Sequence, residues 1–504
     1  MSAQIDVRLE TIRRLLSSVR LVPEDQARYQ PLVVDALVFF LSRLPAERVD
    51  RILLSQGALT HVTADDRLVA LLRECPTLHK LGQVVAHERF LPPSLRVRLS
   101  ALESSPPTTD VTGITRALRA EFGHLPGLQV AEHALAEGSV AVVIPFEWSD
   151  GERGKSRGVL KVLKPRAVES MRQELAIWPE FSEFLEAHAG DDGLPMLDYR
   201  EMLDGVGKLL LDEIDLEKEQ QNLAWAQTFY SNTTEVKIPR LLPFSTPSVT
   251  AMERIEGAQK VTDPAIAARV RDRLAKSIVK TLIAMPFWRV AQPGARFHAD
   301  PHPGNLLVTP EGQLAVIDWA LVTELSEAQL SGVVRALLAA LTFDEAVLIP
   351  AIGELGRVDD EALLRQEVAF GLRRVRRGAA PGFMWLTDLL DRVGRAGAMH
   401  FPEEITLFRK SMLTLSGVLA DVSEHVRADQ LLIRTGVGQF LKELRIRLDA
   451  PLGSRALGTH LSTSDLIRVW TAVPFISTRF FLDSWRDLLR ERDKASGAKN
   501  PAGP

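Results

Sequence analysis

One stretch of the sequence, FHADPHPGNLLVTPEGQLAVIDWALVTEL at residues 297–325, constrains the fold more than any other. Two short apolar runs, Leu306–Thr309 and Gln313–Ile317, flank the tripeptide Pro310-Glu311-Gly312. β-Prone residues on either side of a turn that contains Pro and Gly are typical of a β-hairpin. The sequence therefore predicts a two-stranded antiparallel ribbon that turns at Glu311.

This hairpin is expected to gather polar side chains at its open end. Folding the chain back at the turn places Asn305 opposite Ile317, with Asp318 next to it, and Asp300 enters the same end from the preceding loop. Two carboxylates and an amide oxygen are hard ligands that suit Mg²⁺, which leaves other positions to phosphate oxygens and water. The order Asp, Asn five residues later, and Asp after a hairpin is also that of the kinase catalytic loop and its metal-binding Asp.

Two other interpretations of this stretch are weaker. Asp, Pro and Gly all occur in ordinary turns, so any one of these residues alone favours a structural role. His298 and His302 have the spacing of a helical metal-binding pair, but Pro301 and Pro303 exclude a regular helix there. The three polar residues at this spacing around a hairpin favour the magnesium site.

Composition predicts a cytoplasmic protein. The chain has 504 residues, which suggests three to four domains or subdomains, and its net charge of −4 does not point to a nucleic-acid surface. The single cysteine, Cys75, excludes an intramolecular disulfide, and we expect a buried structural thiol. The N-terminus lacks the apolar run of a signal peptide, and no apolar stretch reaches the roughly 20 residues of a membrane-spanning helix.

The secondary structure expected from the spacing of apolar residues changes three times along the chain, and it predicts an α+β fold. Residues 1–115 show apolar residues at helical spacing, whereas residues 116–257 mix strands with helices. Residues 258–441 are mainly helical apart from the hairpin. Residues 442–504 are expected to form a helical segment followed by a disordered tail.

Two lysines lie in a short β-rich run, GVLKVLKP. Lys161 is expected to point inward, and it needs an anionic partner because an unpaired buried charge is costly. Lys164 follows three residues later, so strand alternation places it on the other face, in solvent.

Acidic residues crowd the helical stretch 203–230. If this stretch is one helix, Asp215 and Glu219 share a face at i,i+4, which is mildly unfavourable for like charges. A buried lysine or a metal ion would relieve the repulsion at this face and at the nearby Glu213. Glu217 is expected to be solvated.

Seven motifs stand in an order that resembles the UbiB/AarF (ADCK) family of atypical protein-kinase-like ATPases. They are KLGQ, a small-residue loop, VLKV, EIDLEKE, ERIEG, HADPHPGN and VIDWA, and they cover about residues 80–325. The motifs FHADPHPGNLLV and KLGQ are the most specific. The resemblance implies a two-lobed protein-kinase-like fold, ATP and Mg²⁺ as cofactors, and a helical N-terminal extension over the active site.

The resemblance also implies a role for each matching residue of the first half. Lys161 corresponds to the strand lysine that contacts the α- and β-phosphates, and Glu219 to its ion-pair partner on a helix. Glu213 and Asp215 match the ExD signature of the nucleotide and metal region. On helical spacing alone, Lys80 and Gln83 of KLGQ would share a solvated helix face; the resemblance makes them the KxGQ signature, whose helix reaches into the cleft and obstructs protein substrates.

Within the hairpin region, the resemblance makes Asp300 the catalytic-loop Asp, and Asn305 and Asp318 the Mg²⁺ ligands. Lys161, Glu219, Asp300 and Asp318 are then expected to line one crevice that binds magnesium-loaded triphosphate. The usual DFG is here Asp318-Trp319-Ala320, which keeps the metal-binding Asp and loses the Gly.

The nucleotide loop departs from the family pattern. The alanine-rich loop falls at Ala136-Glu137-Gly138-Ser139, where Ala136, Gly138 and Ser139 are the expected nucleotide contacts. Glu137 would repel phosphate unless it points away. Gly138 would allow backbone N–H groups to approach phosphate closely.

Three functions fit the sequence. The first is a UbiB-like ATPase or phosphotransferase that supports isoprenoid quinone (ubiquinone) biosynthesis or lipid homeostasis, with a lipid or quinone precursor as partner. The second is a small-molecule kinase of the aminoglycoside- or choline-kinase type, and the third is a nucleotide-binding scaffold without turnover. The stretch 465–489, rich in Trp, Phe and Arg, leaves open a peripheral contact with a membrane or packing in a core, and the oligomeric state stays open.

Overall fold

The computed structural model describes most of the chain as two compact units. The described residues are 10, 12–14, 16, 27, 30–59, 62–86, 111–122, 128–138, 140–149, 155–188, 199–288 and 294–471. The first unit comprises Met1–Ser231, Ile238–Glu256 and Asp318–Leu321, and the second comprises Asn232–Lys237, Gly257–Ile317 and Val322–Pro504. Ser139 and the part of the apolar stretch after residue 471 lie outside the described residues.

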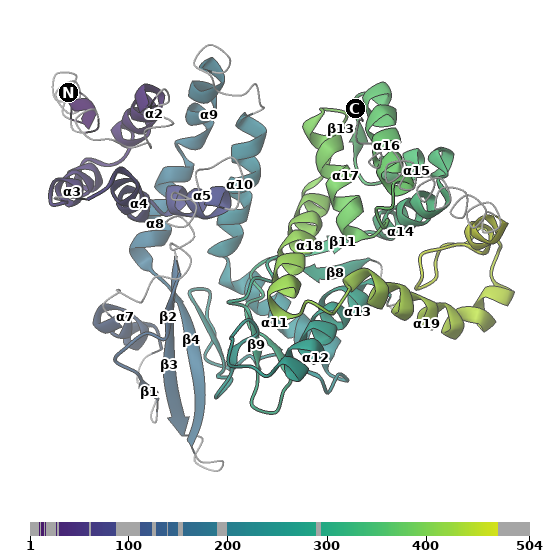
Figure 1. Cartoon of the computed structure of the whole chain (residues 1–504). Helices are drawn as coiled ribbons and strands as arrows, with labels where there is room; N and C mark the ends of the chain where they lie inside the picture. The colour runs from purple at the N-terminus through teal and green to yellow at the C-terminus, as the bar shows by residue number, and fades with distance from the viewer. Residues whose placement is uncertain are drawn as a thin grey trace, which may run out of the picture. The chain divides into compact units, whose positions relative to one another are not determined.

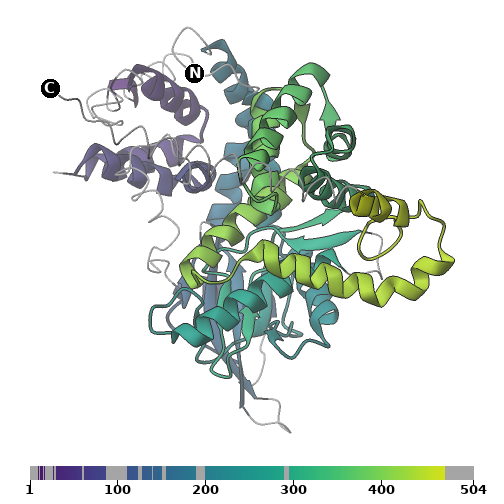
Figure 2. The same cartoon turned by 45° about the vertical axis from the view of Figure 1, so that its right-hand side comes forward.

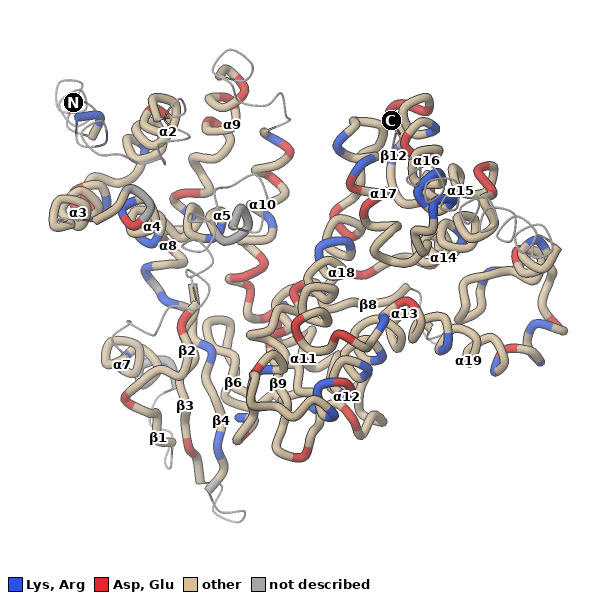
Figure 3. Tube along the Cα trace, viewed as in Figure 1, with Lys and Arg blue, Asp and Glu red and all other residues tan. Residues whose placement is uncertain are grey.

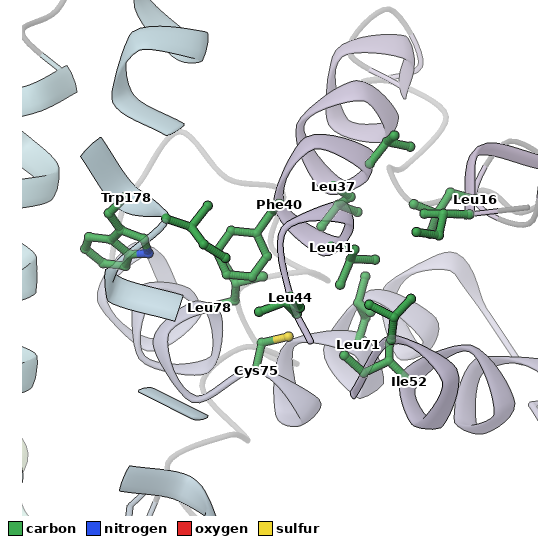
Figure 4. Packing of buried hydrophobic residues seen from close by; sticks show 14 of the residues in the cluster. Leu16, Leu37, Phe40, Leu41, Leu44, Ile52, Leu71, Cys75, Leu78 and Trp178 are labelled. Carbon is green, nitrogen blue, oxygen red and sulfur yellow. The ribbon is translucent and has the colours of Figure 1, made fainter. Parts of the chain in front are cut away.

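Helices from before and after the strands of the sheet form one part of the first unit (Figure 1). They are α2 (Gln30–Ser42), α3 (Ala46–Gly57), α4 (Ala64–Glu74), α5 (Pro76–Ala86), α8 (Pro165–Leu175), α9 (Trp178–Ala187) and α10 (Tyr199–Glu213). The apolar stripe of α2 buries Phe40 and Leu41, which are 1% and 0% exposed. Figure 4 shows this core, in which Phe40, Leu78, Cys75 and Trp178 meet from four different segments. The prediction of a buried Cys75 is confirmed.

A buried ionic network crosses this core. Glu174 of α8 is 0% exposed and forms an ion pair with Arg48 of α3. The second oxygen of the Glu174 carboxylate accepts from the Thr77 backbone N–H at 2.9 Å and from the Thr77 hydroxyl at 2.6 Å. Burial raises the pKa of Glu174, although these donors oppose the shift. The carboxylate thus satisfies the otherwise unpaired amide at the N-terminus of α5 and fixes that helix against α8.

A five-stranded sheet forms the rest of the first unit. Its order is β1-β3-β4-β6, with β2 also pairing with β3, and the described pairs are antiparallel. The strands are β1 (Gln129–Val130), β2 (Ala136–Glu137), β3 (Ala141–Ser149), β4 (Lys155–Leu163) and β6 (Val249–Glu253). Alternation along β3 and β4 buries one face, including Val142 and Leu160, against α7 (Val111–Phe122). The opposite face of β4 is left to carry Lys161.

The second unit contains the predicted hairpin. Strands β9 (Leu306–Val308) and β10 (Leu314–Val316) pair antiparallel, and Gly312 takes the turn with φ +83°. The Ile317 N–H donates to the Asn305 carbonyl at 3.1 Å, so the predicted register is confirmed. Strand β7 (Gln259–Lys260) and strand β5 (Val236–Lys237) complete a four-stranded sheet, in the order β5-β10-β9-β7. A separate pair joins β8 (Ala295–His298) to β11 (Val322–Leu325).

Helices surround these strands. They are α12 (Ala268–Val279), a π-helical turn (Lys280–Ala284), α13 (Met285–Phe287), α14 (Glu327–Thr342), α15 (Glu345–Gly353), α16 (Glu361–Arg376), α17 (Phe383–Arg395), α18 (Glu403–Val422) and α19 (Ala428–Asp449). Strands β12 (Arg357–Val358) and β13 (Met399–His400) form a small pair. Figure 2 shows α12 lying beside α18 and α19. Helices and small sheets together confirm the α+β prediction. Among the described residues, no helix has the length and apolarity needed to cross a bilayer.

Candidate functional site

The centre of the first unit's polar site is Lys161 on β4. Its backbone pairs with β3 and β6, which hold the side chain on the face away from the α7 core. The Nζ atom lies 2.9 Å from Glu219 Oε1 and 3.1 Å from Asp318 Oδ2. The Lys161, Glu219 and Asp318 side chains are 13%, 1% and 35% exposed. The anionic partner expected for Lys161 is therefore present, and there are two such partners, Glu219 and Asp318.

Two carboxylates share this single ammonium group, and the pKa values of Lys161 and Glu219 reflect it. Burial disfavours the charge on Lys161, but the charges of Asp318 and Glu219 outweigh burial and raise the pKa of Lys161 above its ordinary value. Burial raises the pKa of Glu219 to about 7; Lys161 opposes that shift and Asp318 adds to it. The lysine thus stays charged between two carboxyl groups, and a further cation beside them would favour their charged forms.

Trp319 anchors Asp318, its neighbour in the sequence, through packing contacts. Its ring is 1% exposed and packs edge-on against Trp225 of α11 (Leu216–Tyr230), with ring centroids 6.1 Å apart. Asn222, also on α11, donates from Nδ2 to the Trp319 carbonyl at 3.1 Å. The Ala320 N–H donates to Asp318 Oδ1 at 3.0 Å. The tripeptide Asp-Trp-Ala is therefore attached to the same helix that carries Glu219.

The acidic stretch is two helices rather than one. Helix α10 ends at Glu213, and Asp215 is the N-cap of α11, where its side chain accepts from the Lys218 N–H at 2.9 Å. The interpretation of Asp215 and Glu219 as one helical face is wrong, because a polar residue with a local hydrogen bond ends the pattern. Glu217 is exposed, as expected. Figure 3 shows acidic residues at the C-terminal end of α10.

The KLGQ segment lies in α5. Lys80 forms an ion pair with Glu213, and both side chains are largely buried, at 20% and 14% exposed. The face carrying Lys80 is therefore not merely solvated, as spacing alone suggested. Gln83 belongs to the same helix. The structure thus brings one residue of the KxGQ signature to one residue of the ExD signature.

The nucleotide-loop candidates are held by Lys164. The ammonium group of Lys164 forms an ion pair with Glu137 and donates to the Gly138 carbonyl at 2.9 Å. The Gly138 N–H donates to the Ala141 carbonyl at 2.8 Å, which closes the turn after Ala136. The prediction of a solvated Lys164 is wrong, because the strand ends at residue 163 and alternation no longer applies. Glu137 is engaged by a cation of its own unit.

In the second unit, the loop between β8 and β9 carries Asp300 and Asn305. Asn305 is 7% exposed, and its Nδ2 donates to the Asp300 carbonyl at 3.1 Å. His298 Nδ1 accepts from the Asp300 N–H at 3.2 Å, and His302 Nδ1 accepts from the Gly304 N–H at 3.0 Å. Both imidazoles therefore shape the loop.

Helix α18 contributes two further contacts that the sequence pattern did not indicate. Lys410 Nζ lies 3.4 Å from Asp300 Oδ1, and the Ser411 hydroxyl donates to the His298 carbonyl at 2.7 Å. More than 100 residues separate these partners in the sequence, and α18 shows an ordinary helical pattern. No local signal could have identified them.

A family model that matches part of the chain agrees with its motifs. Residues 102–350 match the family model of the "ABC1 atypical kinase-like domain". A protein of Clostridium pasteurianum, described as an "uncharacterized protein in hydrogenase 1 5'region", is 22% identical over 374 residues, which are 71% of this chain and 67% of that protein. A solved structure, "the complex structure of Rv3197-erythromycin from Mycobacterium tuberculosis", is 17% identical with a TM-score of 0.45, and the similarity covers 77% of this chain and 97% of the other.

The matched domain and the motifs together define the class as an atypical kinase-like protein. Within that class, residues 102–350 match the model of the UbiB/ADCK family that the sequence motifs indicated.

Proposed function

We propose that this protein binds ATP with Mg²⁺ and transfers the γ-phosphoryl group to water or to a hydroxyl acceptor. The observation that carries the proposal is Lys161, a buried strand lysine held between Glu219 at 2.9 Å and Asp318 at 3.1 Å. In kinases this lysine positions the phosphates, and the Asp that follows the hairpin binds the metal. The two carboxyl groups beside Lys161 support a role in holding a metal–nucleotide complex.

The donor set suits the magnesium ion. Asp318 offers a half-exposed carboxylate, and Asn305 uses its Nδ2 on the Asp300 carbonyl, which leaves its amide oxygen as a ligand. Carboxylate and amide oxygens are ligands that Mg²⁺ accepts together with phosphate oxygens. When bound, the ion would neutralise charge on the β- and γ-phosphates. We propose that these residues and the Asp300 loop act on the same nucleotide.

In the proposed reaction, Asp300 is the proton acceptor. An oxygen of water or of an alcohol or phenol bonds to the γ-phosphorus, and the bond to the β,γ-bridging oxygen breaks. The proton of the attacking oxygen passes to the Asp300 carboxylate, and ADP leaves. Because this chemistry needs mainly positioning and charge neutralisation, the described groups suffice for it.

Two contacts support nucleotide as the ligand rather than protein substrate. Lys80 from α5 pairs with Glu213, which places the KLGQ helix at the acidic end of α10. The turn at Ala136–Gly138 is closed by the hydrogen bond from the Gly138 N–H to the Ala141 carbonyl and is held by Lys164, which supports a preformed nucleotide loop. By association with the family, we extend the proposal to a role in isoprenoid quinone biosynthesis or lipid homeostasis. In this proposal the protein is cytoplasmic and meets its substrate at the membrane surface.

The test is ATP turnover by the full chain, measured as phosphate release with and without Mg²⁺. Wild type is expected to turn over ATP only with Mg²⁺, and Asp318→Ala to lose about 100-fold or more in kcat. The matched control is Asp204→Ala, at an exposed position of α10, which should behave as wild type. Liposomes and quinone-precursor-like phenols, added separately, identify the acceptor. Equal turnover by wild type and Asp318→Ala would contradict the proposal.

A further inference from the structure

The loop that carries Asp300 contains no cation of its own. Residues 298–305, HADPHPGN, include neither Lys nor Arg. In a phosphoryl transfer the negative charge is spread over the equatorial oxygens of the moving group, and cations close to it lower the barrier. Lys161 is already engaged by two carboxylates of the first unit. A cation beside Asp300 can be sought in the other segments of the second unit.

Helix α18 supplies this cation. The Ser411 side chain is 1% exposed, and its hydroxyl donates to the His298 carbonyl at 2.7 Å. One turn earlier, Phe408 packs edge-on against Phe297, with ring centroids 4.9 Å apart. These contacts fix the register of α18 against the start of the loop. Lys410, between them, is consequently held with its Nζ 3.4 Å from Asp300 Oδ1.

The contact between Lys410 and Asp300 is loose enough to admit a third group. Charge-assisted hydrogen bonds between nitrogen and a carboxylate are typically about 2.7–2.9 Å long, shorter than the 3.4 Å found here. The two side chains are 39% and 25% exposed, so both are open to a ligand from solvent. An ammonium group has three donors, and one directed at Asp300 leaves donors for phosphate oxygens.

Arg409, the residue before Lys410 on α18, forms an ion pair that is purely structural. Arg409 Nε lies 2.8 Å from Asp391 Oδ1, so α18 is tied to α17 by a close ion pair. The guanidinium group of Arg409 stabilises the packing of α18 on α17, whereas the ammonium group of Lys410 contacts the loop that carries Asp300.

From this geometry we infer that Lys410 is a further catalytic residue, whose ammonium group contacts the γ-phosphoryl group during its transfer. The inference rests on the proposed phosphoryl transfer. Lys410 forms and breaks no covalent bond in it: the acceptor oxygen bonds to phosphorus, its proton goes to Asp300, and the bond to ADP breaks. Lys410 stabilises the charge on the moving phosphoryl oxygens while Asp300, beside it, takes the proton.

The experiment compares Lys410→Met and Lys410→Arg with Arg409→Met and wild type. Lys410→Met is expected to lower kcat for ATP by about 100-fold, because one donor to the transition state is lost, and Lys410→Arg to recover to within about tenfold of wild type. Binding of Mg-ADP should change less than threefold in every variant. Binding of Mg-ADP with aluminium fluoride, which mimics the transferring phosphoryl group, should weaken about 100-fold in Lys410→Met alone.

The outcomes separate the two proposals. A merely structural Lys410 would weaken Mg-ADP binding or thermal stability in step with kcat, as a misfolded loop would. Turnover by Lys410→Met within about threefold of wild type would overturn the role of Lys410 and leave the proposed function standing. Absence of Mg²⁺-dependent turnover in wild type would overturn both.

Discussion

Replacing Glu219 with Gln should change how the stability of the first unit depends on pH. Glu219 is 1% exposed, and burial raises its pKa in the folded protein from 4.5 to about 7. A carboxyl whose pKa is raised on folding binds its proton more tightly in the folded state. Its contribution is therefore fully present below about pH 4.5 and is lost as the pH rises through about 7.

The size of this effect follows from the shift. One pKa unit corresponds to about 1.4 kcal/mol, so wild type should lose roughly 3 kcal/mol between pH 4.5 and pH 7 relative to Glu219→Gln. Gln cannot titrate, but its amide oxygen can still accept from Lys161. The same ammonium group is therefore kept in place, and the comparison isolates the proton on Glu219.

Hydrogen exchange at the amides of β3 and β4, measured from pH 4.5 to 7.5, gives the opening free energy of the sheet. The control is Glu217→Gln, on the exposed face of the same helix, which should follow the wild-type profile. The difference between Glu219→Gln and wild type should grow with pH and level off above about pH 7. Parallel profiles, or a difference that grows in the opposite direction, would refute the reasoning about burial.

Three further predictions concern the same unit. Lys161→Met leaves two carboxylates without their shared cation and should destabilise the unit by about 3 kcal/mol. The control Lys208→Met, at an exposed position of α10 in the same unit, should cost less than about 1 kcal/mol; equal losses in thermal unfolding would contradict this. Trp319→Ala should cost about 3–5 kcal/mol and Trp319→Phe clearly less, because the ring fills a buried site beside Trp225; an unchanged melting temperature for Trp319→Ala would show that the ring does not anchor Asp318. Cys75 is buried and burial raises its pKa, so iodoacetamide should modify it only in urea, and rapid labelling of the native protein would count against the described core.

Local sequence signals predicted the hairpin and the partner of Lys161 well. The turn residues and the β-prone runs determine the register of β9 and β10, because a one-residue slip would exchange the two faces. The need of a buried ammonium group for an anion indicated a carboxylate, and the resemblance named Glu219. The domain boundaries proposed from the sequence, and the roles of the site residues, stay predictions.

Contacts between distant segments could not be predicted from local patterns. Lys164 was expected in solvent because strand alternation was carried one residue beyond the end of β4, and its pairing with Glu137 depends on a turn more than 20 residues earlier. The sequence is compatible with a single helix through Asp215, but Asp is also a preferred N-cap and here begins α11. Lys410 lies on an amphipathic helix, and its sequence does not distinguish Lys410 from the other charged residues of that helix. Only the contact with the loop that carries Asp300 does so.

The most direct test of the account is the turnover of Asp300→Asn, measured together with its affinity for Mg-ATP. The substitution keeps the size of the side chain and removes the proton acceptor. We predict a loss of kcat of about 100-fold or more with an affinity within about threefold of wild type, while Asp421→Asn, at an exposed position of α18, matches wild type in both. Full turnover by Asp300→Asn would contradict the assignment of this loop as the catalytic centre.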